Sequence, residues 1–553
     1  MMKMMKNTLY KITLVLLAFF TLGCDVDDFL TEENINALST ESFWKNESQL
    51  EQGLIGAYAA LQLPGSMGGS ASSQFPVRSD VGRPNTWNAN AQGLQRLTFN
   101  DNSSIVRSAW DDNYEGINRA NQVIENAPNI QMDEQDKILI LAQARFLRGL
   151  YYYWLYTSYN EGSIVLYTEI AKDASDFNQP LAPKEDVFAL IDADLKYARE
   201  NLPETWPPSD VGRATWGAAT AVLADLYINE RDFATARDYL KEIIDSRLYS
   251  LTPEIGWNFD EAHEFNSESI FEVSYSKAFK DGFGGNANDG ANRSESTNRA
   301  ETLATTTGGG FRVIMPSYWV TMLFKSDSMD MSDPRNEGRT FSIRASESIA
   351  MADDEFSTFY GRPSDEGGPY NNQEASYLKK FQNWKLTAED ELGRSGINER
   401  VYRLADINLL YAECLLETGG SFDVALDLVN EIRRRSGVRR LVAADYDATS
   451  LMEHIRWVER PLELMFEGRD IRWKDLRRWD AVKEQYDRLA ELEFVIVEKV
   501  LRYYDPAIDT AASPLREYVE AAGNFSPSAH YYFPIPTTER TSNNNLGSGN
   551  TEG

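Results

Sequence analysis

Two distant segments of this 553-residue chain repeat one pattern, and this pattern limits most strongly the folds that the chain can adopt. Residues 221–244 and 409–432 each begin with an apolar helical stretch that contains an alanine. A short polar turn follows in both segments. A phenylalanine then comes in each, Phe233 or Phe422, with another alanine three residues later. Small residues let two helices touch while a large side chain fills the gap, so each segment predicts a helix–turn–helix unit.

The pattern is that of a tetratricopeptide unit, which cannot bury its apolar faces alone and must stack against others. Residues 137–157 are apolar on nearly all faces, which suits a helix buried between other helices. Residues 184–201 have apolar residues at spacings of three and four, and Leu202-Pro203 ends this helix. We therefore expect a mostly α fold built on a tetratricopeptide-like helical scaffold.

Stretches rich in Gly, Ser, Asn and Pro separate the helical segments, at residues 62–108, 277–312 and 351–375. Loops of this length inside a compact protein are usually either functional or disordered. Strand signals are short, as at residues 270–275, and no extended alternation supports a large sheet. The scaffold should therefore carry long loop-rich insertions and few short strands.

Charge and missing motifs exclude several classes of function. The net charge of −30 repels phosphate backbones, so we expect no nucleic-acid partner. The sequence has no GxxxxGK[ST], GxSxG or HExxH motif and no Cys/His cluster. A glycosidase needs only two carboxylates about 5–10 Å apart, but no acidic residue is singled out by a local motif. We expect no catalytic activity, no cofactor and no metal.

The N-terminus has the features of a secretory leader over residues 1–23. Lysines precede an uncharged apolar run at residues 12–22, which is too short to span a bilayer. Gly23 directly precedes Cys24, as a small residue does in a bacterial lipobox. We expect the leader to be removed and Cys24 to carry the lipid that anchors the exported protein. An ordinary leader with an incidental cysteine is the alternative.

Several motifs together resemble SusD/RagB-type outer-membrane lipoproteins. They include GRAT at residues 212–215, EGRDIRWKDLRRW at 467–479 and YFPIP at 532–536. Each motif is weak alone, but their number and order make the resemblance strong over nearly the whole mature length. The matching segments are residues 142–160, 212–227, 268–276, 333–335, 403–414, 428–438, 459–479 and 532–539.

The resemblance implies a leader at residues 1–23 and a single SusD-like domain at 24–553. The N-terminal part of this domain would run to about residue 300 and the C-terminal part from about 301, with about four tetratricopeptide-like units as scaffold. The implied function is non-catalytic capture of oligosaccharides or polysaccharide at the outer membrane, facing the cell surface. The captured glycan would be delivered to a SusC-type TonB-dependent transporter. A peptide-binding RagB-type component of an analogous importer is the alternative.

Two features depart from the family pattern. Pro461 interrupts a helix where the family does not demand proline. The C-terminus, residues 543–553, lacks the aromatic tail often seen, which leaves open how this end is tied down. Neither departure touches the expected binding face.

The first loop carries the strongest candidates for ligand binding. The C–H face of a sugar ring packs flat on an aromatic ring, while sugar hydroxyls need carboxylate, amide and guanidinium partners. Within residues 78–90, Trp87 would be the platform, and the hydrogen-bonding rim would comprise Asp80, Arg83, Asn85 and Asn88. A stacked ring adds about 1 kcal/mol, so one sugar should bind weakly and a chain better. The alternative is that Trp87 anchors the loop to the body.

The other two loops add weaker candidates. Phe283 and Tyr360 join the predicted ligand-binding set, beside the further aromatic residues Phe279, Phe311 and Phe359. Two conspicuous groups should instead be structural. The aromatic residues of 151–156 point all round a helix, which favours core packing. The charges of residues 460–478 alternate in sign at spacings of three and four, which predicts pairing along a helix.

Overall fold

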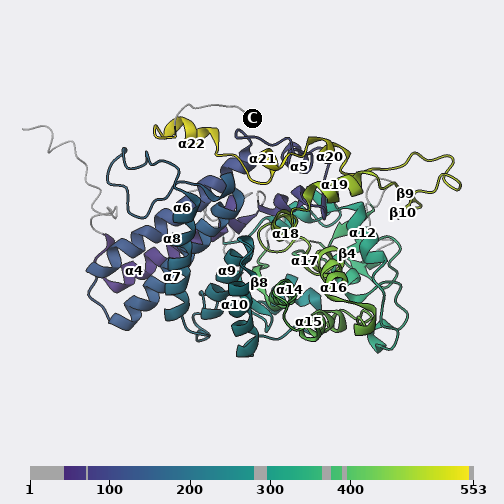
Figure 1. The fold of residues 1–553 in the computed structure, drawn as a ribbon, viewed down its shortest axis with the longest axis horizontal. Coiled ribbons are helices and arrows are strands. Elements are labelled where there is room, and N and C mark those ends of the chain that lie inside the picture. The colour runs from purple at the N-terminus through teal and green to yellow at the C-terminus, as the bar shows by residue number, and fades with distance from the viewer. Residues whose placement is uncertain (1–42, 70–71, 279–294, 364–374, 389–394, 547–553) are drawn as a thin grey trace, which may run out of the picture.

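The computed structural model describes residues 43–69, 72–278, 295–363, 375–388 and 395–546. Most of this part of the chain is helical, and its strands are short (Figure 1). The predicted mostly α class is therefore confirmed.

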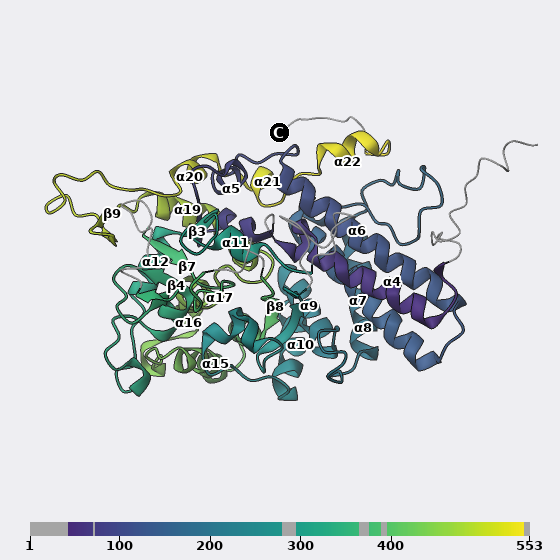
Figure 2. The same cartoon turned by 180° about the vertical axis from the view of Figure 1, so that it is seen from behind.

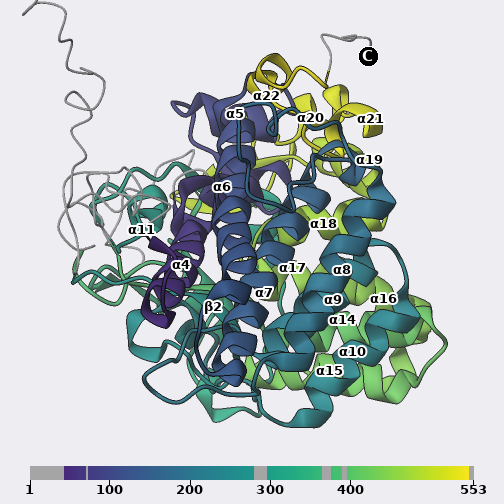
Figure 3. The same ribbon diagram turned by 90° about the vertical axis from the view of Figure 1, so that its left-hand side faces the viewer.

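Long helices lie side by side through the N-terminal half (Figure 3). Each packs on the next in the order α4, α6, α7, α8, α9, α10. Helix α10 also packs on α14, which pairs with α15, so one run of neighbours joins the two halves of the chain. The two predicted helix–turn–helix units are confirmed as α9–α10 and α14–α15. The bounds are α4 (Glu47–Ala59), α6 (Ser104–Asn126), α7 (Glu134–Ser158), α8 (Lys184–Asn201), α9 (Trp216–Asn229), α10 (Phe233–Ser246), α14 (Leu404–Glu417) and α15 (Phe422–Arg435).

Short helices fill the space around this run, mostly in the C-terminal half (Figure 2). They are α5 (Ala89–Gln95), α11 (Arg299–Leu303), α12 (Tyr318–Lys325), α13 (Ile343–Ser348), α16 (Ala448–His454), α17 (Arg460–Leu464), α18 (Ile471–Arg478), α19 (Val482–Ala490), α20 (Val519–Asn524), α21 (Pro527–His530) and α22 (Thr537–Ser542). Pro461 lies in the first turn of α17, directly after a π-helical turn at Ile455–Glu459 that runs on from α16. The proline thus coincides with a local departure from regular α-helical hydrogen bonding, as its missing amide donor requires.

The strands form antiparallel pairs rather than one sheet. The predicted strand at residues 270–275 corresponds to β2. The pairs are β1 (Gly82–Pro84) with β3 (Ile314–Pro316), β2 (Ser269–Val273) with β8 (Glu399–Arg403), β4 (Ile349–Met351) with β7 (Ser376–Leu378), β5 (Thr358–Phe359) with β6 (Arg362–Pro363), and β9 (Phe494–Val497) with β10 (Val500–Tyr503).

The aromatic run of α7 lies in the core, as predicted. The five rings are at most 2% exposed, and two of their hydroxyls donate to backbone carbonyls. The hydroxyl of Tyr151 donates to the carbonyl of Ala57 at 2.8 Å, and that of Tyr152 to the carbonyl of Tyr167 at 2.9 Å. These rings therefore hold α7 to its neighbours and are not open to a ligand.

The prediction of a surface loop beginning at residue 62 is wrong for much of its first part. Residues 64–68 form a π-helical turn and residues 72–78 a 3₁₀ helix, and nearly all of these residues are buried. Glycine makes this burial possible. A Cβ on Gly65 would lie 2.2 Å from the carbonyl oxygen of Ser108, and one on Gly68 would lie 1.5 Å from that of Gln62. The glycines that suggested a loop therefore allow close backbone packing.

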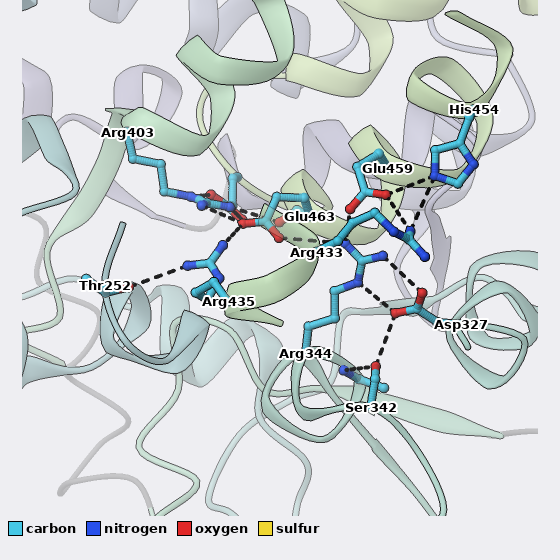
Figure 4. A network of polar contacts seen from close by, with 12 residues as sticks. Thr252, Asp327, Ser342, Arg344, Arg403, Arg433, Arg435, His454, Glu459 and Glu463 are labelled. Carbon is cyan, nitrogen blue, oxygen red and sulfur yellow. Dashed lines mark hydrogen bonds and ion pairs between the residues drawn. The ribbon is translucent and has the colours of Figure 1, made fainter. Parts of the chain in front are cut away.

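A buried network of guanidinium and carboxylate groups ties the C-terminal half together (Figure 4). Glu463 on α17 accepts from Arg403 of β8 at 2.7 Å and from Arg435 of α15. Glu268, just before β2, accepts from the same two arginines, at 2.5 and 3.1 Å. Each carboxylate in the network therefore joins elements that are far apart in the sequence.

The network extends from α17 to α13. Glu459 accepts from Arg344 of α13 at 2.5 Å and from Arg433 of α15 at 2.8 Å. The other side of Arg344 is held by Asp327, with an Nε–Oδ2 distance of 2.8 Å. All of these side chains are almost completely buried.

The charged block at residues 460–478 is structural, as predicted, but the predicted pairing along one helix is largely wrong. Asp475 and Arg478 do pair at a spacing of three. Glu463, Glu467 and Arg472 pair instead with residues elsewhere in the chain. The reason is that the chain leaves the helical conformation between α17 and α18, so residues on either side do not share one helix face.

We expect this network to make the free energy of unfolding depend on pH in the acidic range. Burial alone would raise the pKa of Glu268, Glu459 and Glu463, but the facing guanidinium groups hold each pKa below its ordinary value of 4.5. Carboxylates with a lowered folded pKa contribute stability that is present above the unfolded pKa and lost as pH falls through the folded pKa. Burial raises the pKa of Asp406 and Glu399, so these two contribute in the opposite sense.

Urea denaturation between pH 7 and pH 3 measures this effect. Below about pH 5 the free energy of unfolding should fall by more than about 2 kcal/mol as the carboxylates of the network take up protons. Because buried pairs are screened little, 0.5 M salt should not remove the fall. A level profile down to pH 3 would contradict the role given to the network.

Candidate ligand-binding site

The first candidate loop begins at β1, whose pairing with β3 fixes its direction. The pairing continues past β1, because the backbone amide of Asn85 donates to the carbonyl of Val313 at 2.8 Å. The side-chain amide of Asn85 also donates to the carbonyl of Arg312, at 3.3 Å. Asn85 is only 7% exposed, so it fastens the loop and does not form the rim predicted for it.

Trp87 lies in the turn that connects β1 to α5. The backbone amide of Asn88 donates to the carbonyl of Asn85 at 3.2 Å, and the side-chain oxygen of Asn88 accepts from the amide of Ala91 at 2.9 Å. Asn88 is thus the N-cap of α5, which explains an asparagine here without a ligand. Trp87 itself is 56% exposed, as contact with a ligand requires. The body does not bury this ring, which counts against the alternative that Trp87 anchors the loop.

Phe311 is a second exposed aromatic residue at the same end of the β1–β3 pair. Pro84 is paired with Ile314 and Asn85 is bonded to Val313, and Trp87 and Phe311 each lie two residues beyond this last bonded pair in the sequence. Phe311 is 49% exposed, and its backbone amide donates to the carbonyl of Glu301 at 2.8 Å. Two exposed aromatic residues from distant segments therefore follow the same end of one short antiparallel strand pair.

Asp80 does not belong to this surface. It is completely buried and receives Arg472 in a bidentate pair, with Nε–Oδ1 at 2.8 Å and Nη2–Oδ2 at 2.7 Å. Gln485 donates to the same carboxylate at 2.6 Å. The prediction of Asp80 as a hydrogen-bonding rim residue is therefore wrong. Asp80 ties the start of the loop to α18 and α19.

Arg83 lies beneath the loop and is largely buried. Its guanidinium group lies 4.6 Å from the centre of the Tyr318 ring, and its Nε lies 3.7 Å from Oε1 of Glu517. Burial raises the pKa of Glu517 to about 7, although Arg83 opposes this effect. Arg83 also borders a cleft of about 260 Å³ together with Thr86 and Gln92. It is thus mainly a support for the loop, with one side toward this cleft.

Tyr360 is also misplaced by the sequence prediction. It is 2% exposed, and its hydroxyl donates to Oε1 of Gln382 at 2.8 Å. It belongs to a small separate core with Met315, Tyr377 and Trp384. The predicted lipid anchor Cys24 and the predicted ligand residue Phe283 lie outside the described residues.

The described ranges hold no group of three or more His, Cys, Asp or Glu side chains arranged to bind a metal ion. Within the same ranges, no helix combines the length and apolar character needed to cross a membrane. What the described surface offers beyond this end of the β1–β3 pair is two exposed aromatic residues, Trp87 and Phe311.

Comparison with known proteins decides the family. The model of the SusD family matches residues 267–551, more than half of the chain. The chain belongs to the SusD family. A second family model, described as starch-binding and associating with the outer membrane, matches residues 28–228 of this SusD protein.

Known SusD proteins resemble this chain over almost its whole length. SusD-like protein P2 of Formosa agariphila is 25% identical over 97% of this chain and 98% of its own. A SusD superfamily protein of Bacteroides vulgatus has a TM-score of 0.75 at 23% identity, with coverage of 91% of this chain and 99% of its own. A laminarin binding SusD-like protein has a TM-score of 0.67 at 24% identity, with coverage of 91% and 99%. These structures share the fold.

Substitutions of Asp80 and Trp87 should affect stability differently, because Asp80 is buried and Trp87 is exposed. Asp80→Ala leaves the buried guanidinium of Arg472 without its partner, which should lower the free energy of unfolding by about 3–5 kcal/mol. Trp87→Ala removes an exposed ring and should change this quantity by no more than about 0.5 kcal/mol. Chemical denaturation of both variants measures the difference. A stable Asp80→Ala protein would reopen a role for Asp80 at the surface.

Proposed function

We propose that this protein captures oligosaccharides or polysaccharide at the cell surface and delivers them to a SusC-type TonB-dependent transporter, without catalysing a reaction. In this proposal residues 1–23 are a leader and residues 24–553 form one SusD-like domain anchored in the outer membrane by lipid on Cys24. The family description of starch binding and outer-membrane association supports the proposal. So do a SusD-like carbohydrate binding protein of Bacteroides fragilis and the laminarin binding protein among the structural relatives.

The observation that carries the proposal is that Trp87 and Phe311 are both exposed just beyond the same end of the β1–β3 pair. The backbone bonds of Asn85 and the capping of α5 hold the Trp87 turn before any ligand arrives, which reduces the entropy lost on binding. Two aromatic faces on one surface suit successive rings of a glycan chain better than a single sugar.

The carboxylates that support the loop argue against catalysis at this place. Hydrolysis of a glycosidic bond needs two carboxyl groups that reach the substrate. Asp80 is buried against Arg472, and the side chain of Glu517 is only 6% exposed. Neither can approach a sugar held on Trp87 unless the loop moves. The net charge of −30 also favours neutral over strongly acidic glycans.

Affinity electrophoresis with the mature chain against soluble neutral and acidic polysaccharides tests the function and the site. We expect retardation by at least one neutral polysaccharide. Trp87→Ala and Phe311→Ala should each weaken binding by about 1 kcal/mol, which is roughly fivefold. Phe356→Ala is the matched control, because Phe356 is 52% exposed and its ring packs against Arg339.

Retardation that is unchanged in both variants would keep glycan capture but overturn the site. If no polysaccharide retards the protein while oligopeptides bind it in a calorimeter, the peptide-binding alternative would replace glycan capture.

The lipid anchor has its own test. In cells fed a labelled fatty acid, the wild-type protein should carry the label and fractionate with the outer membrane. Cys24→Ala should remove the label and release the protein from the membrane, because in this proposal the lipid on Cys24 is what attaches the mature chain. Cys414→Ala is the control, since Cys414 is buried in the core. A label that persists in Cys24→Ala would contradict the anchor.

A further inference from the structure

A cleft of about 460 Å³ opens between α6, the segment that follows α7 and the C-terminal helix α22. Figure 1 shows α22 lying along the edge of the molecule beside these elements. The cleft shares no lining residue with the Trp87 loop or the cleft beneath it. Its size is within the range of small-molecule sites in proteins.

One wall of the cleft is a row of aromatic rings. Trp110 and Tyr114 have ring centres 4.7 Å apart, Tyr114 and Tyr167 5.6 Å apart, and Tyr167 and Phe177 6.4 Å apart. The row runs from the core to the surface, since Trp110 is 2% exposed and Phe177 58% exposed. A ligand that enters the cleft therefore meets aromatic rings from its mouth to its floor.

The charged residues that line the cleft are all acidic: Asp111, Glu115, Glu169 and Glu539. Asp111 and Glu115 are already paired with arginines on α6, Arg107 at 2.9 Å and Arg119 at 2.8 Å. No described Lys or Arg side chain lies within 4 Å of the carboxylates of Glu169 and Glu539.

The carboxylate of Glu539 contacts the aromatic wall. It accepts from two neutral donors only, Nδ2 of Asn543 at 3.0 Å and Nε1 of Trp110 at 3.4 Å. Burial raises the pKa of Tyr167, and the negative charge of Glu539 raises it further, which agrees with their closeness. A half-buried carboxylate with neutral partners among aromatic rings favours a cation.

The C-terminal segment holds Glu539 in place. The backbone amide of Thr537 donates to the carbonyl of Asp101 at 3.0 Å, and Arg540 pairs with the carboxylate of Asp101. The side chain of Asn543 donates to the carbonyl of Gln179 at 2.8 Å, which closes the segment onto the far side of the cleft. These bonds answer how this C-terminus is tied down, and they fix the cleft before a ligand binds.

We infer that this cleft is a second binding site, which takes a compact ligand with a positively charged ammonium group. The ring faces of Tyr167 and Phe177 would attract the cation through their quadrupoles, and Glu539 would supply the counter-charge. An amino sugar and a free amine without a sugar ring share this chemistry. The inference does not depend on glycan capture at Trp87.

Isothermal titration at pH 6.5 with four small probes tests the inference. The probes are glucosamine, N-acetylglucosamine, glucose and choline. Glucosamine and N-acetylglucosamine differ in charge at one nitrogen, so we expect glucosamine to bind at least tenfold more tightly than N-acetylglucosamine and glucose. Choline binding would identify the cation alone as the recognised group, and its absence beside glucosamine binding would show that the sugar ring is also needed. Equal binding of glucose and glucosamine, or no binding of any probe, would overturn the inference.

Variants locate the binding and separate it from the Trp87 surface. Glu539→Gln keeps the size of the side chain and removes its charge, and Phe177→Ala removes the exposed ring. Each should weaken glucosamine binding at least fivefold. The matched controls Glu185→Gln and Phe356→Ala change exposed residues elsewhere and should leave it unchanged, as should Trp87→Ala.

A measurement on the wild-type protein covers the case in which a variant does not fold. Glucosamine binding should weaken as salt rises from 0.02 to 0.5 M, because screening weakens an attraction between opposite charges. Binding that is independent of salt, or glucosamine binding that survives in Glu539→Gln, would overturn the cation site.

Discussion

The buried pairs between guanidinium and carboxylate groups are the constraint on which the C-terminal half depends. Glu459, Glu463 and Glu268 each accept from two arginines, and the arginines come from α13, α15 and β8. Such groups add little net stability compared with apolar side chains, but an unpaired one is very costly. The pairs therefore act mainly by excluding other arrangements. Only the packing that brings every partner together avoids a buried, unpaired charge.

A buried ion pair of the same kind also positions the candidate ligand surface. Asp80 receives Arg472 and Gln485, so the chain enters β1 from a fixed point in the body. Asn85 then carries the pairing with β3 one step further, and the capped helix α5 closes the turn. Trp87 can therefore be exposed and still be held in place. The residues beside it that seemed suited to bind sugar are mostly the ones that build its support.

The two candidate sites differ in what surrounds their aromatic rings. The two charged residues that the sequence placed beside Trp87, Asp80 and Arg83, are paired and completely or largely buried, which leaves the exposed ring and suits a neutral sugar. In the cleft under α22, Glu539 accepts hydrogen bonds from neutral donors and has no Lys or Arg partner among the described residues. The strongly negative chain thus offers one surface where charge is neutralised and one cleft where it is left available. This contrast makes the two sites separable by the charge of the ligand.

The sequence by itself determined the helices and the family. Apolar periodicity gave the helix–turn–helix units, and Leu202-Pro203 ended α8 where the pattern predicted. These signals are local, because the spacing of the apolar residues within a helix shows which face of that helix is buried. The sequence also singled out Trp87, since an aromatic residue in a polar loop is conspicuous. Tertiary structure alone decided which neighbours are buried. Asp80 meets Arg472, Phe311 comes to the same end of the β1–β3 pair as Trp87, and Tyr167 and Phe177 line one cleft with Glu539 only because distant segments fold together. A local sequence pattern does not show which partner a carboxylate will have in the folded protein. The fold therefore decides whether the carboxylate supports the structure or binds a ligand.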